Sequence, residues 1–147
     1  MAGTIALSKI LDIREQEKKD AQLAYHQSVD SFEQVATKLF NILKRKEMAE
    51  EAYDEALKES MHLDYIQDQL MYIETLNKKI LELQGQVQQA RTTMESKQVK
   101  LSNAHVETKK FEKIIEFRIN EESDARKRAE DSLMDEISIQ QYLSHKK

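Results

Sequence analysis

The sequence contains no cysteine, no proline and no tryptophan, and only two of its 147 residues are glycine. Without cysteine the chain forms no disulfide and carries no thiol nucleophile, which fits a reducing compartment. With so little glycine it lacks the residues for a Walker loop or a dinucleotide-binding fingerprint. Aromatic residues make up 6% of the chain and charged residues 34%, which excludes a wide globular core and favours long helices.

Charge and hydropathy narrow the class of protein further. The 23 basic and 27 acidic residues are well mixed and leave a net charge of −4, so we expect no nucleic-acid partner, which would need a basic face. There is no run of about 18 apolar residues that would span a membrane. Lys9 is not followed by the apolar core of a signal peptide. We therefore expect a cytoplasmic protein, either helical or, on composition alone, disordered.

Two heptad repeats decide against disorder, because disordered segments show no period. Apolar residues spaced by three and four are typical of a coiled-coil seam, which must be covered by a facing helix. The second half of the chain carries the longer repeat, formed by Ile66, Ile73, Leu76, Ile80, Leu83, Val87, Ala90, Met94, Lys97, Leu101, Ala104, Thr108, Phe111 and Ile115. The first half carries Leu7, Leu11, Arg14, Lys18, Ala21, Tyr25, Ser28, Phe32, Val35, Leu39, Ile42, Lys46, Ala49, Tyr53 and Ala56.

The two repeats are out of phase, and the stretch between them is aperiodic. We therefore predict one helix over about 5–58, a turn at about 59–62 and a second helix over about 63–141. Ser60 or His62 would begin the second helix, and Asp64 with Gln67 has capping-box spacing. Folding back at residue 61 pairs seam residues whose numbers add up to 122, such as Ala49 with Ile73, and small residues then face large ones. The fold class is thus all-α, a long antiparallel two-helix coiled-coil hairpin.

The first helix is too short to cover the second, so residues 116–147 form a helical overhang on a single coiled-coil rod. Its first part is almost wholly polar. Beyond it lies an apolar cluster that has no partner in the hairpin, either a frayed tail or a docking surface. This cluster consists of Leu133, Met134, Ile137, Ile139, Tyr142 and Leu143.

The residues offer little for catalysis. Four histidines are scattered, and Glu59-x-x-His62 has the spacing of half a di-iron site, but a second copy is missing. A two-helix rod also has no concavity that would enclose a substrate. We predict no enzyme activity, no cofactor and no metal. The basic triplets at residues 44–46 and 126–128 have acidic neighbours, which favours a solvated face.

Apolar residues off the seam are more informative. Phe40, Leu43, Met71 and Tyr72 lie in the half of the hairpin nearest the turn. They either pack along the sides of the seam or form an interaction patch, for which aromatic anchors are typical.

Four short segments give the chain a resemblance to a known family. They are Leu7-Ser8-Lys9-Ile10-Leu11-Asp12-Ile13-Arg14-Glu15, Tyr72-Ile73-Glu74-Thr75-Leu76, Lys110-Phe111-Glu112-Lys113-Ile114 and the acidic pair Asp135-Glu136. In order, spacing and chain length the sequence resembles the flagellar type III export protein FliJ family, with its injectisome stalk relatives. The match covers nearly the whole chain.

The resemblance implies a stalk like that of rotary ATPases. Its paired ends would insert into the pore of the hexameric flagellar export ATPase, and its turn-proximal surface would contact the export-gate membrane protein. Family members also bind unloaded export chaperones. The protein would then lie on the cytoplasmic face of the cell membrane through these partners. The alternative, from another class, is a self-associating coiled-coil scaffold or adaptor unrelated to export.

Site residues carry over position by position. The motif implies Phe111, Glu112 and Lys113, with Lys110 beside them, at the stalk end, and Tyr72 and Leu76 on the gate-facing patch. The family often has further aromatics before the turn, where this chain has Arg45 and Ala49. The full set of candidate partner-binding residues is Phe40, Ile42, Arg45, Tyr72, Leu76, Lys110, Phe111, Glu112, Lys113, Leu133 and Ile137.

Overall fold

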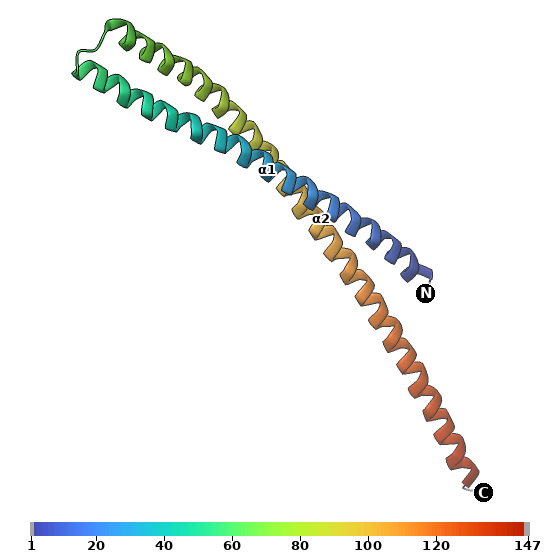
Figure 1. The fold of residues 1–147 in the computed structure, drawn as a ribbon. Coiled ribbons are helices and arrows are strands. Elements are labelled where there is room, and N and C mark those ends of the chain that lie inside the picture. Colours follow the sequence, from blue (N-terminus) through green and yellow to red (C-terminus); the bar gives the residue numbers. More distant parts are fainter. Residues whose placement is uncertain (1, 146–147) are drawn as a thin grey trace. The chain divides into compact units, whose positions relative to one another are not determined.

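The computed structural model describes residues 2–145 as two long α-helices joined by a short turn (Figure 1). Helix α1 spans Ala2–Lys58 and helix α2 spans Leu63–His145. Residues 2–145 contain no strand, so the predicted all-α hairpin is confirmed. Both helices are slightly longer than the sequence predicted, at the N-terminal end of α1 and at the C-terminal end of α2.

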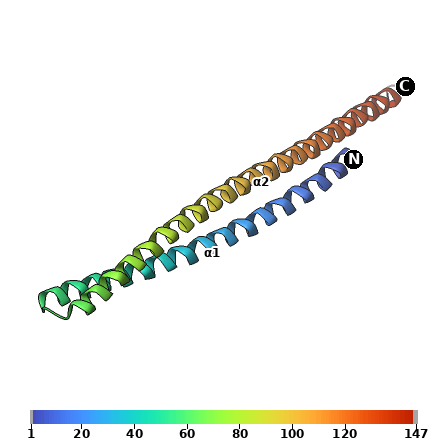
Figure 2. The same ribbon diagram turned by 90° about the horizontal axis from the view of Figure 1, so that it is seen from above.

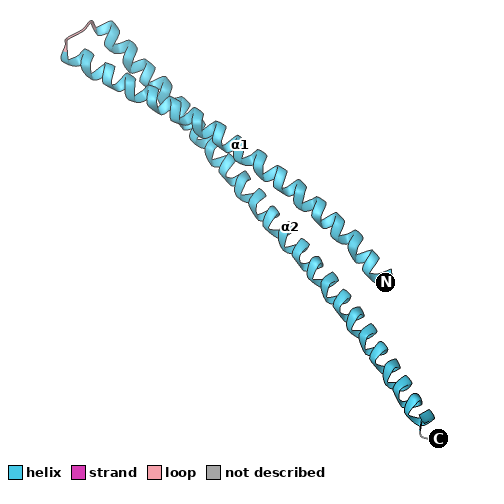
Figure 3. Ribbon diagram, turned by 60° about the horizontal axis from the view of Figure 1, so that its bottom comes forward, coloured by secondary structure: helices cyan, strands magenta, loops and turns pink. Residues whose placement is uncertain are grey.

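The turn occupies residues 59–62 and appears as the only loop between the helices of the described chain (Figure 3). The Met61 amide donates a hydrogen bond to the Ala56 carbonyl at 3.1 Å. Ser60 adopts a φ of 54°, in the left-handed region. Helix α1 therefore ends in a Schellman arrangement, at a position where glycine is usual and another residue costs about 1 kcal/mol.

Helix α2 begins directly after His62, which is one of the two predicted starts. The His62 carbonyl accepts the first hydrogen bond of the helix, from the Ile66 amide at 3.2 Å. The expected capping box of Asp64 and Gln67 is wrong, because Asp64 already lies inside the first turn of α2. At that position its carboxylate interacts favourably with the positive end of the helix dipole.

Packing divides the chain into two compact units. The hairpin unit comprises residues 20–102 and includes the turn, and the terminal unit comprises residues up to 19 together with those from 103 onward. In each unit a stretch of α1 lies beside a stretch of α2 that runs in the opposite direction (Figures 1 and 2). The single rod over residues 1–147 stays a prediction.

The seam predicted from the heptads is the seam of the structure. Every residue of the two predicted repeats is buried or half-buried. In the hairpin unit Ala49, Ile73 and Leu76 form a buried cluster against which Ile42 and Tyr53 pack. In the terminal unit the Thr108 hydroxyl lies 3.3 Å from the Arg14 carbonyl. Both contacts fit the predicted pairing, in which Ala49 faces Ile73 and Arg14 faces Thr108.

Candidate functional site

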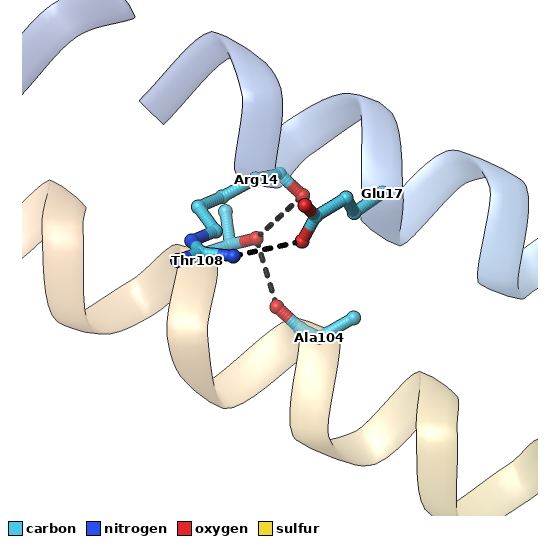
Figure 4. Close-up of polar contacts among 4 residues, drawn as sticks. All are labelled: Arg14, Glu17, Ala104 and Thr108. Atoms are coloured by element: carbon cyan, nitrogen blue, oxygen red, sulfur yellow. Dashed lines mark hydrogen bonds and ion pairs between the residues drawn. The ribbon is translucent and has the colours of Figure 1, made fainter. Parts of the chain in front are cut away.

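A polar layer interrupts the seam of the terminal unit. The Thr108 hydroxyl donates a hydrogen bond to the Ala104 carbonyl at 2.9 Å and also lies within reach of the Arg14 carbonyl (Figure 4). The Arg14 Nη1 donates to the Glu17 carboxylate at 3.0 Å. Thr108 is buried, whereas Arg14 is half-buried. The buried Thr108 hydroxyl therefore has hydrogen-bond acceptors on both helices and is not left unpaired.

Phe111 lies next to this layer. The Arg14 guanidinium carbon is 5.6 Å from the centroid of the Phe111 ring, which is within the range of a cation–π contact. The Arg14 Nε is buried and has no hydrogen-bond partner among residues 2–145. Arg14 thus covers the aromatic face at the cost of one unsatisfied donor, and the predicted stalk-end residue Phe111 is packed within the helix pair.

The other predicted stalk-end residues are exposed or half-buried. Lys110 and Lys113 are exposed, and Glu112 is half-buried. The Glu112 carboxylate lies 3.4 Å from the Lys109 ammonium. An exposed pair of this kind contributes well under 1 kcal/mol to stability, so these charges are available to a partner.

The overhang is helical to His145. The Thr4 hydroxyl donates to the Glu122 carboxylate at 3.4 Å, close to the start of α1. From residue 123 to residue 145 every position of α2 is exposed. Among the candidate residues, Leu133 and Ile137 therefore lie one turn apart on a helix surface that α1 does not cover.

The candidate residues of the hairpin unit divide into buried and exposed ones. Leu76 is buried and Ile42 is half-buried, and both belong to the cluster around Ala49. Arg45 and Tyr72 are exposed. Ile42 and Leu76 therefore lie in the packed seam, while the side chains of Arg45 and Tyr72 are exposed to solvent.

Phe40 lies on a different side of α1 from Arg45. The Lys44 ammonium lies over the Phe40 ring, 4.6 Å from its centroid, in a cation–π contact. Arg45 instead lines a groove between α1 and α2 together with Ile42, Lys38 and other residues described below. Phe40 follows Lys38 by two positions, so their side chains point about 160° apart around the helix axis. The structure thus separates Phe40 from Arg45 and the groove that Arg45 lines.

The described chain holds no arrangement suited to a metal centre or a membrane span. No group of three or more histidine, aspartate or glutamate side chains within residues 2–145 could hold a metal ion. Over the same residues, neither helix has a segment both long enough and apolar enough to cross a bilayer.

Comparison with known proteins agrees with the sequence motifs. A family model described as the flagellar FliJ protein matches residues 3–147. The chain belongs to this family. A flagellar FliJ protein of Bacillus subtilis (strain 168) is 34% identical over 143 residues, which cover 97% of this chain and 97% of that relative. No solved structure matches the chain. The predicted resemblance to the FliJ family is confirmed.

Sequence reasoning missed two basic residues near Arg45. Lys38 and Lys79 line the same groove as Arg45. The spacing of Lys38 and Arg45, one heptad apart, was the available signal, because residues seven apart lie along one side of a helix. Lys79 is one heptad after Tyr72 on α2 and follows the same rule.

Proposed function

We propose that this protein is a non-enzymatic, stalk-like component of the flagellar protein-export apparatus. Its paired helices and overhang bind in the pore of the hexameric export ATPase, and its turn-proximal surface contacts the export-gate membrane protein and export chaperones. It is cytoplasmic and reaches the cytoplasmic face of the cell membrane through these partners. Family membership supports the flagellar assignment, and the finer role is inferred from the surfaces of the chain.

The observation that carries the proposal is the uncovered end of α2. Residues 123–145 form an exposed helix that carries several large apolar side chains. Leu133 and Met134 are more than half exposed, as are Ile139 and Leu143. Exposed apolar residues in this number on one helix are typical of a surface that a partner covers. The basic stretch at residues 126–128 and the acid pair Asp135-Glu136 add a polar rim.

The mechanism in this proposal is coupling through contacts. A helix pair that binds more tightly to one state of the ATPase cycle shifts the hexamer toward that state. The same protein, held at its other end by the gate, links the two partners by a coupling free energy. No bond chemistry on this chain is needed.

The test is stimulation of the cognate export ATPase by the purified full chain. We expect added protein to raise the ATPase rate, and the double variant Leu133→Ala/Ile137→Ala to need about ten-fold more protein for half-maximal effect. Because both side chains are exposed, the variant should fold normally. Phe111→Ala should weaken stimulation as well, but it also removes a packed ring from the seam.

The matched control is Val99→Ala/Val106→Ala, which truncates two exposed apolar residues elsewhere on α2. It should leave stimulation unchanged. An ATPase rate that does not respond to saturating protein contradicts the proposal. Analytical ultracentrifugation distinguishes the scaffold alternative, which requires a stable dimer, from the hairpin, which should sediment as a monomer.

A further inference from the structure

A groove on the hairpin unit is lined by basic residues from both helices. Its volume is about 340 Å³. Three of its side chains are cations, two are amides and two are apolar. They are Lys38, Asn41, Ile42 and Arg45 from α1 and Lys79, Leu83 and Gln86 from α2. No lining residue is acidic, so the groove presents a concentrated positive charge.

Other hollows on the same unit lack this character. One is lined by small and neutral polar residues with a single lysine, Lys97. Another places Lys38 beside two carboxylates, those of Asp30 and Glu33, on the surface of α1. The cationic groove is therefore a local feature and does not follow from a basic hairpin, since the whole chain is acidic.

The cations of the groove are weakly compensated. Among the described residues 2–145, neither Lys38 nor Arg45 forms an ion pair. The Lys79 ammonium lies 3.6 Å from the Glu82 carboxylate, and both side chains are at least half exposed. Such a pair exchanges readily with a competing carboxylate because exposed ion pairs contribute little.

The floor of the groove is apolar. Leu83 is 2% exposed and closes the bottom, with the half-buried Ile42 beside it. Tyr72, Lys79 and Gln86 follow one another at intervals of seven, so they lie along one side of α2. The exposed Tyr72 ring thus continues the same surface toward the turn, and the groove combines an aromatic anchor with a cationic rim.

We propose that this groove docks an acidic amphipathic helix of a partner protein as a third helix along the hairpin. The groove between two helices accepts a ridge of side chains from another helix. Lys38 and Arg45 are one heptad, or about 10 Å, apart along α1. A partner helix with acidic residues seven positions apart would present its carboxylates at the same spacing. Arg45 supplies the bidentate contact that carboxylates favour.

This inference rests on the proposed function in one respect only, which is that the docked helix belongs to an export partner. Around Arg45 the groove is lined by cations from both helices. The partner helix that fits this chain is therefore acidic where it meets the groove. Charge complementarity of this kind selects partners and accelerates association.

The experiment measures binding of a fluorescein-labelled helical peptide by fluorescence anisotropy, using the full chain. The peptide has leucines at heptad core positions and glutamates beside them. A second peptide with glutamine at the glutamate positions is the uncharged probe. We expect only the acidic peptide to bind, and raising NaCl from about 0.05 to about 0.5 M to weaken it, since the Debye length falls below the size of the groove.

Three variants locate the site. Arg45→Ala should weaken binding by about ten-fold and Arg45→Glu should abolish it. Lys44→Ala removes the same charge from the neighbouring residue, which packs on Phe40 away from the groove, and should change binding less than about two-fold. Circular dichroism should show equal helicity for all three, because the substituted side chains lie on the surface.

Several outcomes overturn the inference. Equal losses for Arg45→Ala and Lys44→Ala would mean that binding follows overall charge. Tighter binding of a single-stranded oligonucleotide than of the acidic peptide would assign the groove to nucleic acid. Self-association that Arg45→Ala removes would assign it to a second copy. If the peptide does not bind but the ATPase is stimulated normally, only the proposed docking in the groove is refuted. If the peptide binds but the ATPase is not stimulated, only the proposed stalk function is refuted.

Discussion

The hairpin unit and the terminal unit use the same heptad repeat but bury different side chains in it. In the hairpin unit the buried seam residues near the turn are aliphatic, among them Ile73, Leu76 and Leu83. In the terminal unit the described residues include one buried side chain, the hydroxyl-bearing Thr108, and the seam also holds Arg14 and Lys18. The heptad period therefore determines which residues lie in the seam, and the chemistry of their side chains determines how stable the pairing of the two helices is.

The difference has an energetic meaning. Burial of aliphatic side chains contributes about 1.5 to 3 kcal/mol each. A polar layer contributes little net stability, since its hydrogen bonds replace bonds to water. We infer that residues 2–19 of α1 are held more weakly against their partner stretch of α2 than the residues near the turn are held against theirs.

The largest expected effect is truncation of a buried leucine. Leu83→Ala should lower the free energy of unfolding of the hairpin unit by about 3 kcal/mol, through lost burial and a cavity. Leu11→Ala, at a half-buried position in the terminal unit, should cost about 1 kcal/mol. Hydrogen exchange measured by mass spectrometry reports each unit separately. Equal losses of protection for the two variants would contradict the comparison.

An intermediate effect is expected from making the terminal unit resemble the hairpin unit. Arg14→Leu removes the unsatisfied Nε and places an aliphatic residue opposite Thr108, which should stabilise the pairing of residues 2–19 by about 1 kcal/mol. The measurement is slower amide exchange in those residues. Arg14→Ala serves as control and should accelerate exchange, because it uncovers the Phe111 ring. Faster exchange in Arg14→Leu would show that the polar layer stabilises the unit.

The smallest effect compares the two glycines. Gly85 lies inside α2 in the hairpin unit, and a Cβ there would meet nothing within 4 Å. Gly85→Ala should therefore stabilise the protein by about 1 kcal/mol through helix propensity. Gly3→Ala should gain less, because its Cβ would come within 2.9 Å of the Arg118 Nη1, which must move aside. Urea unfolding followed by circular dichroism measures both, and a larger gain at Gly3 would contradict the comparison.

Much of the fold could be predicted from the sequence because a heptad repeat predicts both that a segment is helical and which of its faces is buried. The hairpin followed from the phase break between Ala56 and Ile66 and from the mirror pairing of the two repeats. The turn chemistry could not be read, because Ser60 occupies a left-handed position that glycine normally marks. The predicted start of α1, at about residue 5, lies three residues after the observed start at Ala2, because Gly3 and Thr4 have low helix propensity.

The candidate site was less accessible to sequence reasoning. Heptad spacing identified Ile42 and Leu76 as seam residues. It could not show that their side chains are too buried to contact a partner directly. Phe40 and Tyr72 both lie in the half of the hairpin nearest the turn, but the side of the helix pair on which each one lies depends on the rotation of its helix about its axis. Heptad spacing could align the basic residues within each helix, but the groove around Arg45 forms only where α1 and α2 pack against each other.

The Arg14–Thr108 layer has one more consequence. Heptad repeats look the same after a shift of seven residues, so two long helices could slide past each other and still match apolar side chains. Such a slide would set Arg14 against Leu101 or Ile115 and would bury its charge among aliphatic groups, which is strongly unfavourable. A polar layer that weakens the seam locally thus also helps to fix the alignment of the two helices.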